Sequence, residues 1–146
     1  MRAESTGCRP VVGAKIALLS GDRVLTHLRD DFAQLPFPGH WDFPGGAREG
    51  SETAEACALR ELHEEYGLTL DPARLLWRRD YPSEHVPGGT AAFFGGRITA
   101  AEIAAIVFGD EGQRWEMMEV AAFRAHPRAV PYLRDRLGDY LASGLV

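Results

Sequence analysis

The chain has 146 residues, of which 45% are hydrophobic and 25% are charged, and its formal net charge is −5. This length suits a single domain across residues 1–146, with a core large enough to fold without disulfides. The negative charge argues against a nucleic-acid polymer as partner, because a protein that binds the phosphate backbone needs a basic face. It leaves a single nucleotide open, since metal ions can bridge an acidic site to phosphates.

The start of the chain carries no sign of a leader or a membrane anchor. Residues 1–10 lack the apolar core of a signal sequence and are predicted to form a flexible N-terminus. The apolar run that follows is short and is interrupted by Lys15, so no membrane span is expected. Two cysteines give no disulfide framework, and Cys57 is predicted to be a small buried residue. These features predict a cytoplasmic protein.

The N-terminal third of the chain alternates β-prone runs with turns. Residues 11–19 and 23–29 are apolar and are separated by Ser-Gly-Asp, which predicts a β-hairpin. Residues 30–40 contain two prolines and a glycine and are predicted to form a loop. Residues 41–43 favour a short strand that runs into a turn at residues 44–46.

A helix is predicted next, because the segment is rich in Ala, Leu and Glu. Ser51 is a candidate N-cap with Glu52 in the first turn, and Gly67 is a natural C-terminal stop.

The rest of the chain predicts three further strands and a last helix. The strands are expected at residues 75–81, 90–98 and 114–118. The helix is expected to begin at Pro131, and its apolar stripe consists of Leu133, Leu137, Tyr140 and Leu141. Strands on both sides of a central helix, with a second helix at the end, indicate an α/β fold in which a mixed sheet packs between helices.

Three glutamates crowd one side of the central helix. At about 100° per residue, Glu61, Glu64 and Glu65 fall within an arc of roughly 100°, and the apolar residues of this turn point elsewhere. Like charges at this spacing destabilise an isolated helix by a few tenths of a kcal/mol per pair. A divalent cation would reverse that effect, and carboxylate oxygens suit Mg²⁺ or Mn²⁺. The alternative is a solvated acidic face.

The surrounding positions carry a family resemblance. Residues 46–68 match the pattern G-x5-E-x7-R-E-U-x-E-E-x-G-U, where U is aliphatic, at every fixed position. The matching residues are Gly46, Glu52, Arg60, Glu61, Leu62, Glu64, Glu65, Gly67 and Leu68. This stretch resembles the signature of the Nudix hydrolases, and the order of the flanking elements is similar to the rest of that domain.

The resemblance implies a fold, a reaction and a set of ligands. The Nudix fold is an α/β/α sandwich with a central mixed sheet, and its members hydrolyse nucleoside diphosphate derivatives with water and a divalent metal. Carried onto this chain, Glu64 and Glu65 would bind Mg²⁺ or Mn²⁺, with the backbone carbonyl of Gly46 as a further ligand. Glu61 would be a metal ligand or the base that deprotonates the attacking water.

The same resemblance assigns supporting roles around these acids. Arg60 and Glu52 would form an ion pair that orients Glu61. Family members often supply another acidic ligand or base from a loop beyond the signature. Glu111 is the best candidate for this catalytic and metal-binding role, with Glu116 or Asp110 as alternatives.

Three residues are candidates for substrate binding. Arg29 ends the second predicted strand, where its guanidinium could reach a substrate phosphate, although a surface charge is an equal alternative. Trp41 and Phe43 could stack on a base, and packing in the core is the favoured alternative for both.

The substrate is less well defined, because specificity in this fold lies in loops outside the signature. The chain is most similar to small members that cleave nucleoside triphosphates, including oxidised ones such as 8-oxo-dGTP, to the monophosphate and pyrophosphate. Pro82 lies near the place of a proline associated with ADP-ribose hydrolysis, and dinucleoside polyphosphates and nucleotide sugars are further alternatives. A non-catalytic nucleotide sensor and an RNA-end hydrolase are less favoured. Dimers are frequent in the family, so a homodimer is possible.

Overall fold

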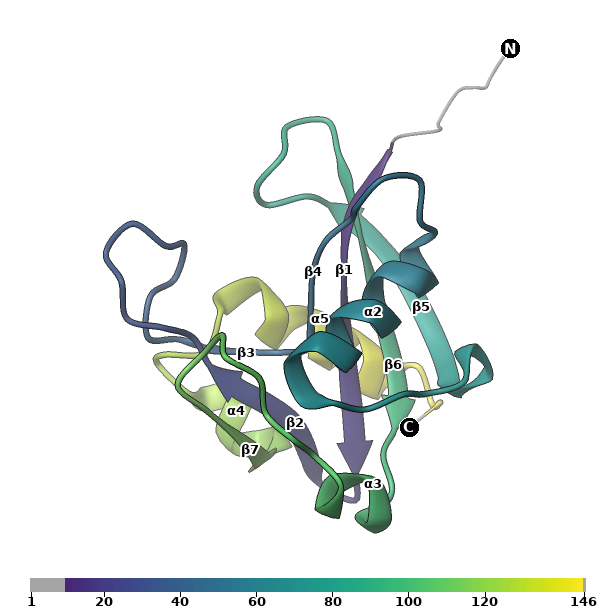
Figure 1. The fold of residues 1–146 in the computed structure, drawn as a ribbon, viewed down its shortest axis with the longest axis vertical. Helices are drawn as coiled ribbons and strands as arrows, with labels where there is room; N and C mark the ends of the chain where they lie inside the picture. The colour runs from purple at the N-terminus through teal and green to yellow at the C-terminus, as the bar shows by residue number, and fades with distance from the viewer. Residues whose placement is uncertain (1–9, 146) are drawn as a thin grey trace.

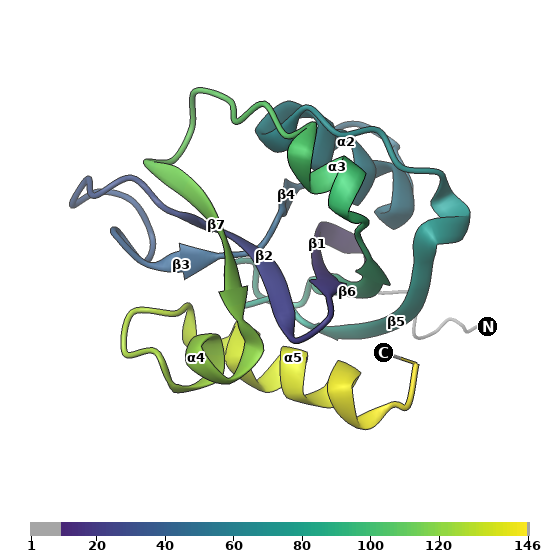
Figure 2. The same ribbon diagram turned by 90° about the horizontal axis from the view of Figure 1, so that it is seen from below.

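The computed structural model describes residues 10–145 and consists of a mixed β-sheet between two layers of helices (Figures 1 and 2). The predicted flexible segment at residues 1–10 lies outside the described residues, except for its last residue. None of the described helices is long and apolar enough to cross a membrane.

The sheet contains seven strands. They are β1 (Val11–Ser20), β2 (Arg23–Leu28), β3 (Trp41–Asp42), β4 (Gly45–Ala47), β5 (Leu75–Pro82), β6 (Thr90–Arg97) and β7 (Arg114–Glu119). The main path runs β3-β2-β1-β6-β5, and β4 and β7 pair with β1 and β2 respectively. Because β1 and β6 run parallel while the other pairs are antiparallel, the sheet is mixed, as the sequence predicted.

The two central strands separate at one end of the sheet. The predicted hairpin is present, but β1 and β2 pair only at Leu19–Val24 and Ser20–Arg23, next to the turn. Beyond that point β1 takes β4 as its antiparallel neighbour, while β2 pairs with β3. The divergence of β1 and β2 leaves room for charged side chains, and Lys15 of β1 and Arg29, which follows β2, both contact Asp42.

Helices cover both faces of the sheet. Helices α2 (Ala54–Tyr66) and α3 (Ala100–Ala104) lie on one face, and α4 (Val120–Ala125) and α5 (Pro131–Ala142) lie on the other (Figure 2). A short 3₁₀ helix, η1 (Pro72–Arg74), precedes β5. Each face has its own hydrophobic core, one built around Leu62 and Tyr66 of α2 and the other around Leu133 and Leu137 of α5. This arrangement confirms the predicted α/β/α sandwich.

The ends of α2 explain how the acidic helix is positioned. Thr53 is the N-cap, with its hydroxyl accepting a hydrogen bond from the Ala56 N–H at 3.1 Å. The prediction of Ser51 as N-cap is therefore wrong by two residues, and Glu52 lies before the helix rather than in its first turn. Gly67 ends the helix as predicted, in the left-handed conformation with φ of 69° that glycine adopts without strain.

The other differences between the predicted and observed secondary structure lie mostly at the ends of elements. The turn expected at residues 44–46 instead runs into the short strand β4, which begins at Gly45. Cys57 is fully buried, as predicted. In α5 the stripe residues Leu133, Leu137 and Tyr140 are buried, while Leu141 is half-buried.

Candidate active site

Two of the signature glutamates on α2 lie directly against the glycines of β4. Helix α2 crosses β4 so that the carboxylate of Glu61 lies directly over Gly46. A Cβ added at Gly46 would stand 2.2 Å from Glu61 Oε2 and 2.7 Å from the carboxylate carbon. Only glycine therefore permits this contact, because no real side chain tolerates such distances.

The backbone groups of Gly45, not those of Gly46, face the glutamates. In an antiparallel ladder, alternate residues bond to the partner strand. Ile16 N–H donates to the Pro44 carbonyl and Arg48 N–H to the Val12 carbonyl, both at 2.9 Å, so Gly46 between them also faces β1. The Gly46 carbonyl also accepts the Cys57 thiol at 3.5 Å. In this structure the Gly46 carbonyl therefore faces β1 and Cys57 rather than the glutamates, whereas the neighbouring Gly45 presents its N–H to Glu65 and is the better-placed backbone ligand.

Glu65 is the most buried of the three acids. Its Oε1 accepts a hydrogen bond from the Gly45 N–H at 3.0 Å. Burial raises the pKa of Glu65 to about 8, although Lys15 and the Gly45 N–H both act to lower it. A carboxylate in this position holds a proton easily, and a nearby cation would favour its ionised form.

Glu61 has a milder environment. Its side chain is 15% exposed, and burial raises its pKa, with Arg60 opposing the shift and Glu64 adding to it. A raised pKa makes the Glu61 carboxylate a stronger base, which suits a group that must accept a proton.

Arg60 links α2 to the segment that precedes it. Its Nη2 contacts Glu52 Oε1 at 2.7 Å and donates to the Ala47 carbonyl at 3.0 Å. The hydrogen bond from Arg60, together with one from the Glu49 N–H, lowers the pKa of Glu52 to about 2. Arg60 Nη1 also lies 3.7 Å from Glu61 Oε2. The predicted Arg60–Glu52 ion pair is present, and it is placed where it can restrain Glu61.

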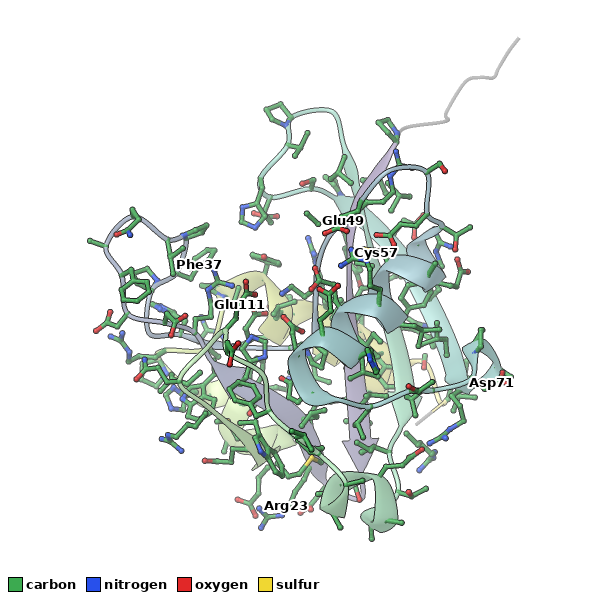
Figure 3. All side chains as sticks on the ribbon, in the orientation of Figure 1. Arg23, Phe37, Glu49, Cys57, Asp71 and Glu111 are labelled. Carbon is green, nitrogen blue, oxygen red and sulfur yellow. The ribbon has the colours of Figure 1, made fainter. Side chains whose placement is uncertain are left out.

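The loop before β7 brings one further acid to the site (Figure 3). Glu111 lines the same cavity as Glu61 and Glu65. The alternatives do not line it: Glu116 is paired with Arg114 at 3.3 Å on β7, and Asp110 is absent from the cavity wall. Of the three candidates, the geometry favours Glu111.

These acids do not form a complete metal-binding site by themselves. Within residues 10–145, no three Asp, Glu, His or Cys side chains converge closely enough to hold an ion. Glu64 forms an ion pair with Arg60 at 3.2 Å, and Glu65 accepts a hydrogen bond from the Gly45 N–H. These two interactions keep the carboxylates apart. The donor chemistry still fits Mg²⁺, since this ion is commonly bound by one or two carboxylates and completes its shell with waters and substrate phosphates.

A buried charge cluster that was not predicted from the sequence lies beside these acids. Asp42 Oδ2 accepts hydrogen bonds from Lys15 Nζ and Arg29 Nη1, both at 2.9 Å. Burial alone would raise the pKa of Asp42, but the two cations outweigh it and lower the pKa to about 2. The signal that the sequence offers for this cluster is a lysine and an aspartate within apolar, β-prone segments.

We expect that replacing Asp42 by alanine destabilises the protein by about 3–5 kcal/mol, because it leaves Lys15 and Arg29 partly buried without their counter-ion. Urea unfolding followed by circular dichroism would measure the change. Asp80→Ala is the control, since its pair with Arg78 is largely exposed and should be worth less than about 1 kcal/mol. Equal effects of the two substitutions would contradict the structural role of Asp42.

The predicted substrate-binding residues divide into two groups. Arg29 lines the cavity, and although Asp42 holds one of its nitrogens it remains accessible at 25% exposure. Trp41 and Phe43 do not line the cavity. Phe43 is fully buried and stacks on Phe123 with ring centroids 4.5 Å apart, and Trp41 is 6% exposed beneath Arg114. Base stacking by either ring is therefore wrong for this structure, and the packing alternative is correct.

The cavity has a volume of about 430 Å³ and a chemically mixed wall. Glu61, Glu65 and Glu111, which we call the acidic end, line it together with Lys15 and Arg29. The wall also includes Phe37, residues 83–86 of the loop between β5 and β6, and Tyr132 and Arg136 of α5. Its size falls in the range of small-molecule sites, and its polarity suits a ligand with one phosphorylated and one planar end.

The mixed-sheet sandwich and its acid-lined cavity define an α/β domain built around a loop–helix–loop signature. A model described as the NUDIX domain matches residues 9–136, and the chain belongs to this family. This confirms the resemblance found in the sequence.

Individual relatives support the same assignment. The chain is 41% identical over 68 residues to the 8-oxo-dGTP diphosphatase of Proteus vulgaris, a match that covers 42% of this chain and 58% of that protein. It is 41% identical over 75 residues to an RNA pyrophosphohydrolase of Actinobacillus pleuropneumoniae, covering 51% of this chain and 33% of the relative. The chain thus spans about a third to just over half the length of these curated relatives.

The fold is similar to solved structures at low sequence identity. The crystal structure of the MutT protein from Methanosarcina mazei Go1 superposes with a TM-score of 0.71 at 18% identity, and the match covers 92% of this chain and 96% of that one. Such a similarity establishes the fold.

Proposed function

We propose that this protein is a Mg²⁺- or Mn²⁺-dependent pyrophosphohydrolase that cleaves a nucleoside triphosphate to the monophosphate and pyrophosphate. The observation that carries the proposal is the placement of Glu61, Glu65 and Glu111 at one end of a nucleotide-sized cavity. A cytoplasmic location and a homodimer remain predictions.

The residues of the acidic end have distinct roles in this proposal. Glu64, Glu65 and Glu111, with the Gly45 carbonyl in place of that of Gly46, would hold the divalent ion. When bound, such an ion polarises phosphoryl oxygens and lowers the pKa of water. Glu61 would accept the proton of the attacking water, and Arg60 would keep its carboxylate in position. Arg29 would bind a substrate phosphate.

Several substrates compete within this reaction class. A nucleoside triphosphate, oxidised or not, is favoured by the similarity to a relative named 8-oxo-dGTP diphosphatase. ADP-ribose, nucleotide sugars and dinucleoside polyphosphates are alternatives, although Pro82, which suggested ADP-ribose, simply ends β5. A relative named RNA pyrophosphohydrolase supports keeping an RNA 5′ end among the alternatives.

The test is a product assay across canonical and oxidised dNTPs, ADP-ribose, a nucleotide sugar, a dinucleoside polyphosphate and a 5′-triphosphorylated RNA, each with Mg²⁺. The proposal expects the fastest release of monophosphate and pyrophosphate from a dNTP. Binding without product from any of these compounds would favour the second candidate function, a non-catalytic nucleotide sensor.

We expect Glu111→Gln to lower turnover by about 10-fold or more, because the substitution removes a charge from the acidic end without changing its shape. Steady-state rates at saturating Mg²⁺ would measure it. Glu116→Gln is the matched control on the following strand and should retain full activity. If the two variants exchange these outcomes, the additional acid is Glu116.

A further inference from the structure

The wall of the cavity also contains a buried arginine that the proposed reaction does not use. Arg136 of α5 lines the cavity and its side chain is only 6% exposed. Its guanidinium lies between the rings of Tyr81 and Tyr132, 4.5 Å from each ring centroid. The two rings fix the plane of the guanidinium and therefore the direction of its N–H donors.

Most of the hydrogen-bonding capacity of this arginine is unused within the protein. In the part of the chain that the structure describes, its one hydrogen bond runs from Nη2 to the Pro82 carbonyl at 3.3 Å. Burying a guanidinium with so few partners is costly, and burial indeed lowers the pKa of Arg136. A ligand that supplied an acceptor would offset that cost.

An acceptor lies next to these donors. Glu84, on the loop after β5, also lines the cavity, and its Oε2 is 3.7 Å from Arg136 Nη2. Its side chain is 49% exposed, so it can turn toward a ligand at little cost. Together, Arg136 and Glu84 present a fixed donor beside a mobile acceptor.

Aromatic rings border the same place. Phe37 and Tyr132 meet edge to face with centroids 6.0 Å apart, and His85 Nε2 lies 3.2 Å from the Tyr132 hydroxyl. Phe37 has a φ of 49°, a left-handed conformation that costs free energy for a residue with a side chain. Figure 3 shows Phe37 on the same side of the molecule as Glu111. The part of the cavity wall around Phe37 and Tyr132 can thus accept the flat face of a base.

We propose that Arg136 and Glu84 select keto bases over amino bases. A base with a keto group places a carbonyl acceptor next to a ring N–H donor, as at O6 and N1 of guanine or hypoxanthine and at O4 and N3 of uracil or thymine. The donors of Arg136 would bind the carbonyl, and Glu84 would accept the ring N–H. Adenine and cytosine reverse this pattern, so each would place a donor against Arg136 and an acceptor against Glu84.

The expected preference for keto bases follows from the free-energy cost of leaving hydrogen-bonding groups unpaired. A mismatched base leaves a buried donor without its acceptor, and good paired contacts to one base edge discriminate by about 1–3 kcal/mol. This range corresponds to roughly 5- to 150-fold in kcat/KM. The inference rests on the proposed nucleotide hydrolysis and specifies the substrate class of that site.

The experiment compares two pairs of substrates that differ only at the relevant position. We expect kcat/KM for dITP to exceed that for dATP by about 10-fold or more, and dUTP to exceed dCTP in the same way. The binding of the monophosphates dIMP and dAMP, measured by calorimetry, should show the same order even where turnover is slow. Ratios near one in both pairs and in binding would overturn the inference while leaving the hydrolysis proposal intact.

Two variants assign the preference to these residues. Glu84→Gln removes the charge and offers a donor as well as an acceptor, so the dITP/dATP ratio should fall toward one while the rate with dITP changes less. Arg136→Met retains much of the stem between the two tyrosines and should also lower the ratio. Because Glu84 is half exposed, its variant tests the inference even if Arg136→Met fails to fold. An unchanged ratio in Glu84→Gln would overturn the role of Glu84.

Discussion

Replacing Glu64 by glutamine is expected to lower turnover at least about 100-fold while leaving the fold intact. The side chain is 54% exposed and its ion pair is with Arg60 at 3.2 Å, so loss of the charge should cost little stability. Metal binding by Glu64, by contrast, would require its negative charge. Initial rates at several Mg²⁺ concentrations would measure the effect, and raising Mg²⁺ should recover part of the activity.

A glutamate on the same helix provides the control. Neither glutamate lines the cavity, but Glu64 lies between Glu61 and Glu65 in the chain, whereas Glu55 lies in the first turn of α2 and pairs with Arg78 at 3.3 Å. Glu55→Gln should therefore keep the wild-type rate. Near-normal turnover of Glu64→Gln at ordinary Mg²⁺ would remove Glu64 from the proposed ligands.

Replacing Gly46 by valine is expected to lower turnover by about 100-fold, for a steric reason. A Cβ at this position would stand 2.2 Å from Glu61 Oε2, so the carboxylate must move away. Displacement of a reacting group by about 1 Å can cost roughly 100-fold in rate. Arg97→Val, at the exposed end of β6 and outside the cavity wall, is the control and should remain active.

A double-mutant cycle tests whether Gly46 acts through Glu61. If it does, adding Gly46→Val to Glu61→Gln should cost little beyond Glu61→Gln alone, because the group to be displaced is already inactive. Multiplicative losses would show that the glycine has a separate function, such as a backbone contact with the ligand.

The fold was largely predictable because its local signals agree with its packing. Alternating β-prone runs and turn residues located the hairpin, and Gly67 marked the end of α2. The helix start was misplaced because Ser51 and Thr53 are both suitable caps, and only the packing of α2 on β4 distinguishes them. Helices α3 and α4 are five and six residues long and carry too little periodicity to predict.

The clustering of Glu61, Glu64 and Glu65 was predictable from their helical spacing, and their roles and that of Glu111 from the family resemblance, but the backbone and charge partners were not. Whether Gly45 or Gly46 faces the glutamates depends on how β4 pairs with β1, which the sequence alone does not determine. The Lys15–Asp42–Arg29 cluster joins β1, β3 and the end of β2, so only the fold brings it together. Trp41 and Phe43 pack in the core, while Phe37 from the preceding loop lines the cavity.

The central claim is that these carboxylates use a divalent cation to hydrolyse a nucleotide's phosphoanhydride bond. Phosphorus NMR of a dNTP incubated with the purified protein tests it most directly, with Mg²⁺ in one sample and excess EDTA in the other. We predict that monophosphate and pyrophosphate appear with Mg²⁺ and that neither forms with EDTA. Equal product formation in both samples, or intact nucleotide in the presence of Mg²⁺ across the whole substrate panel, would contradict the account.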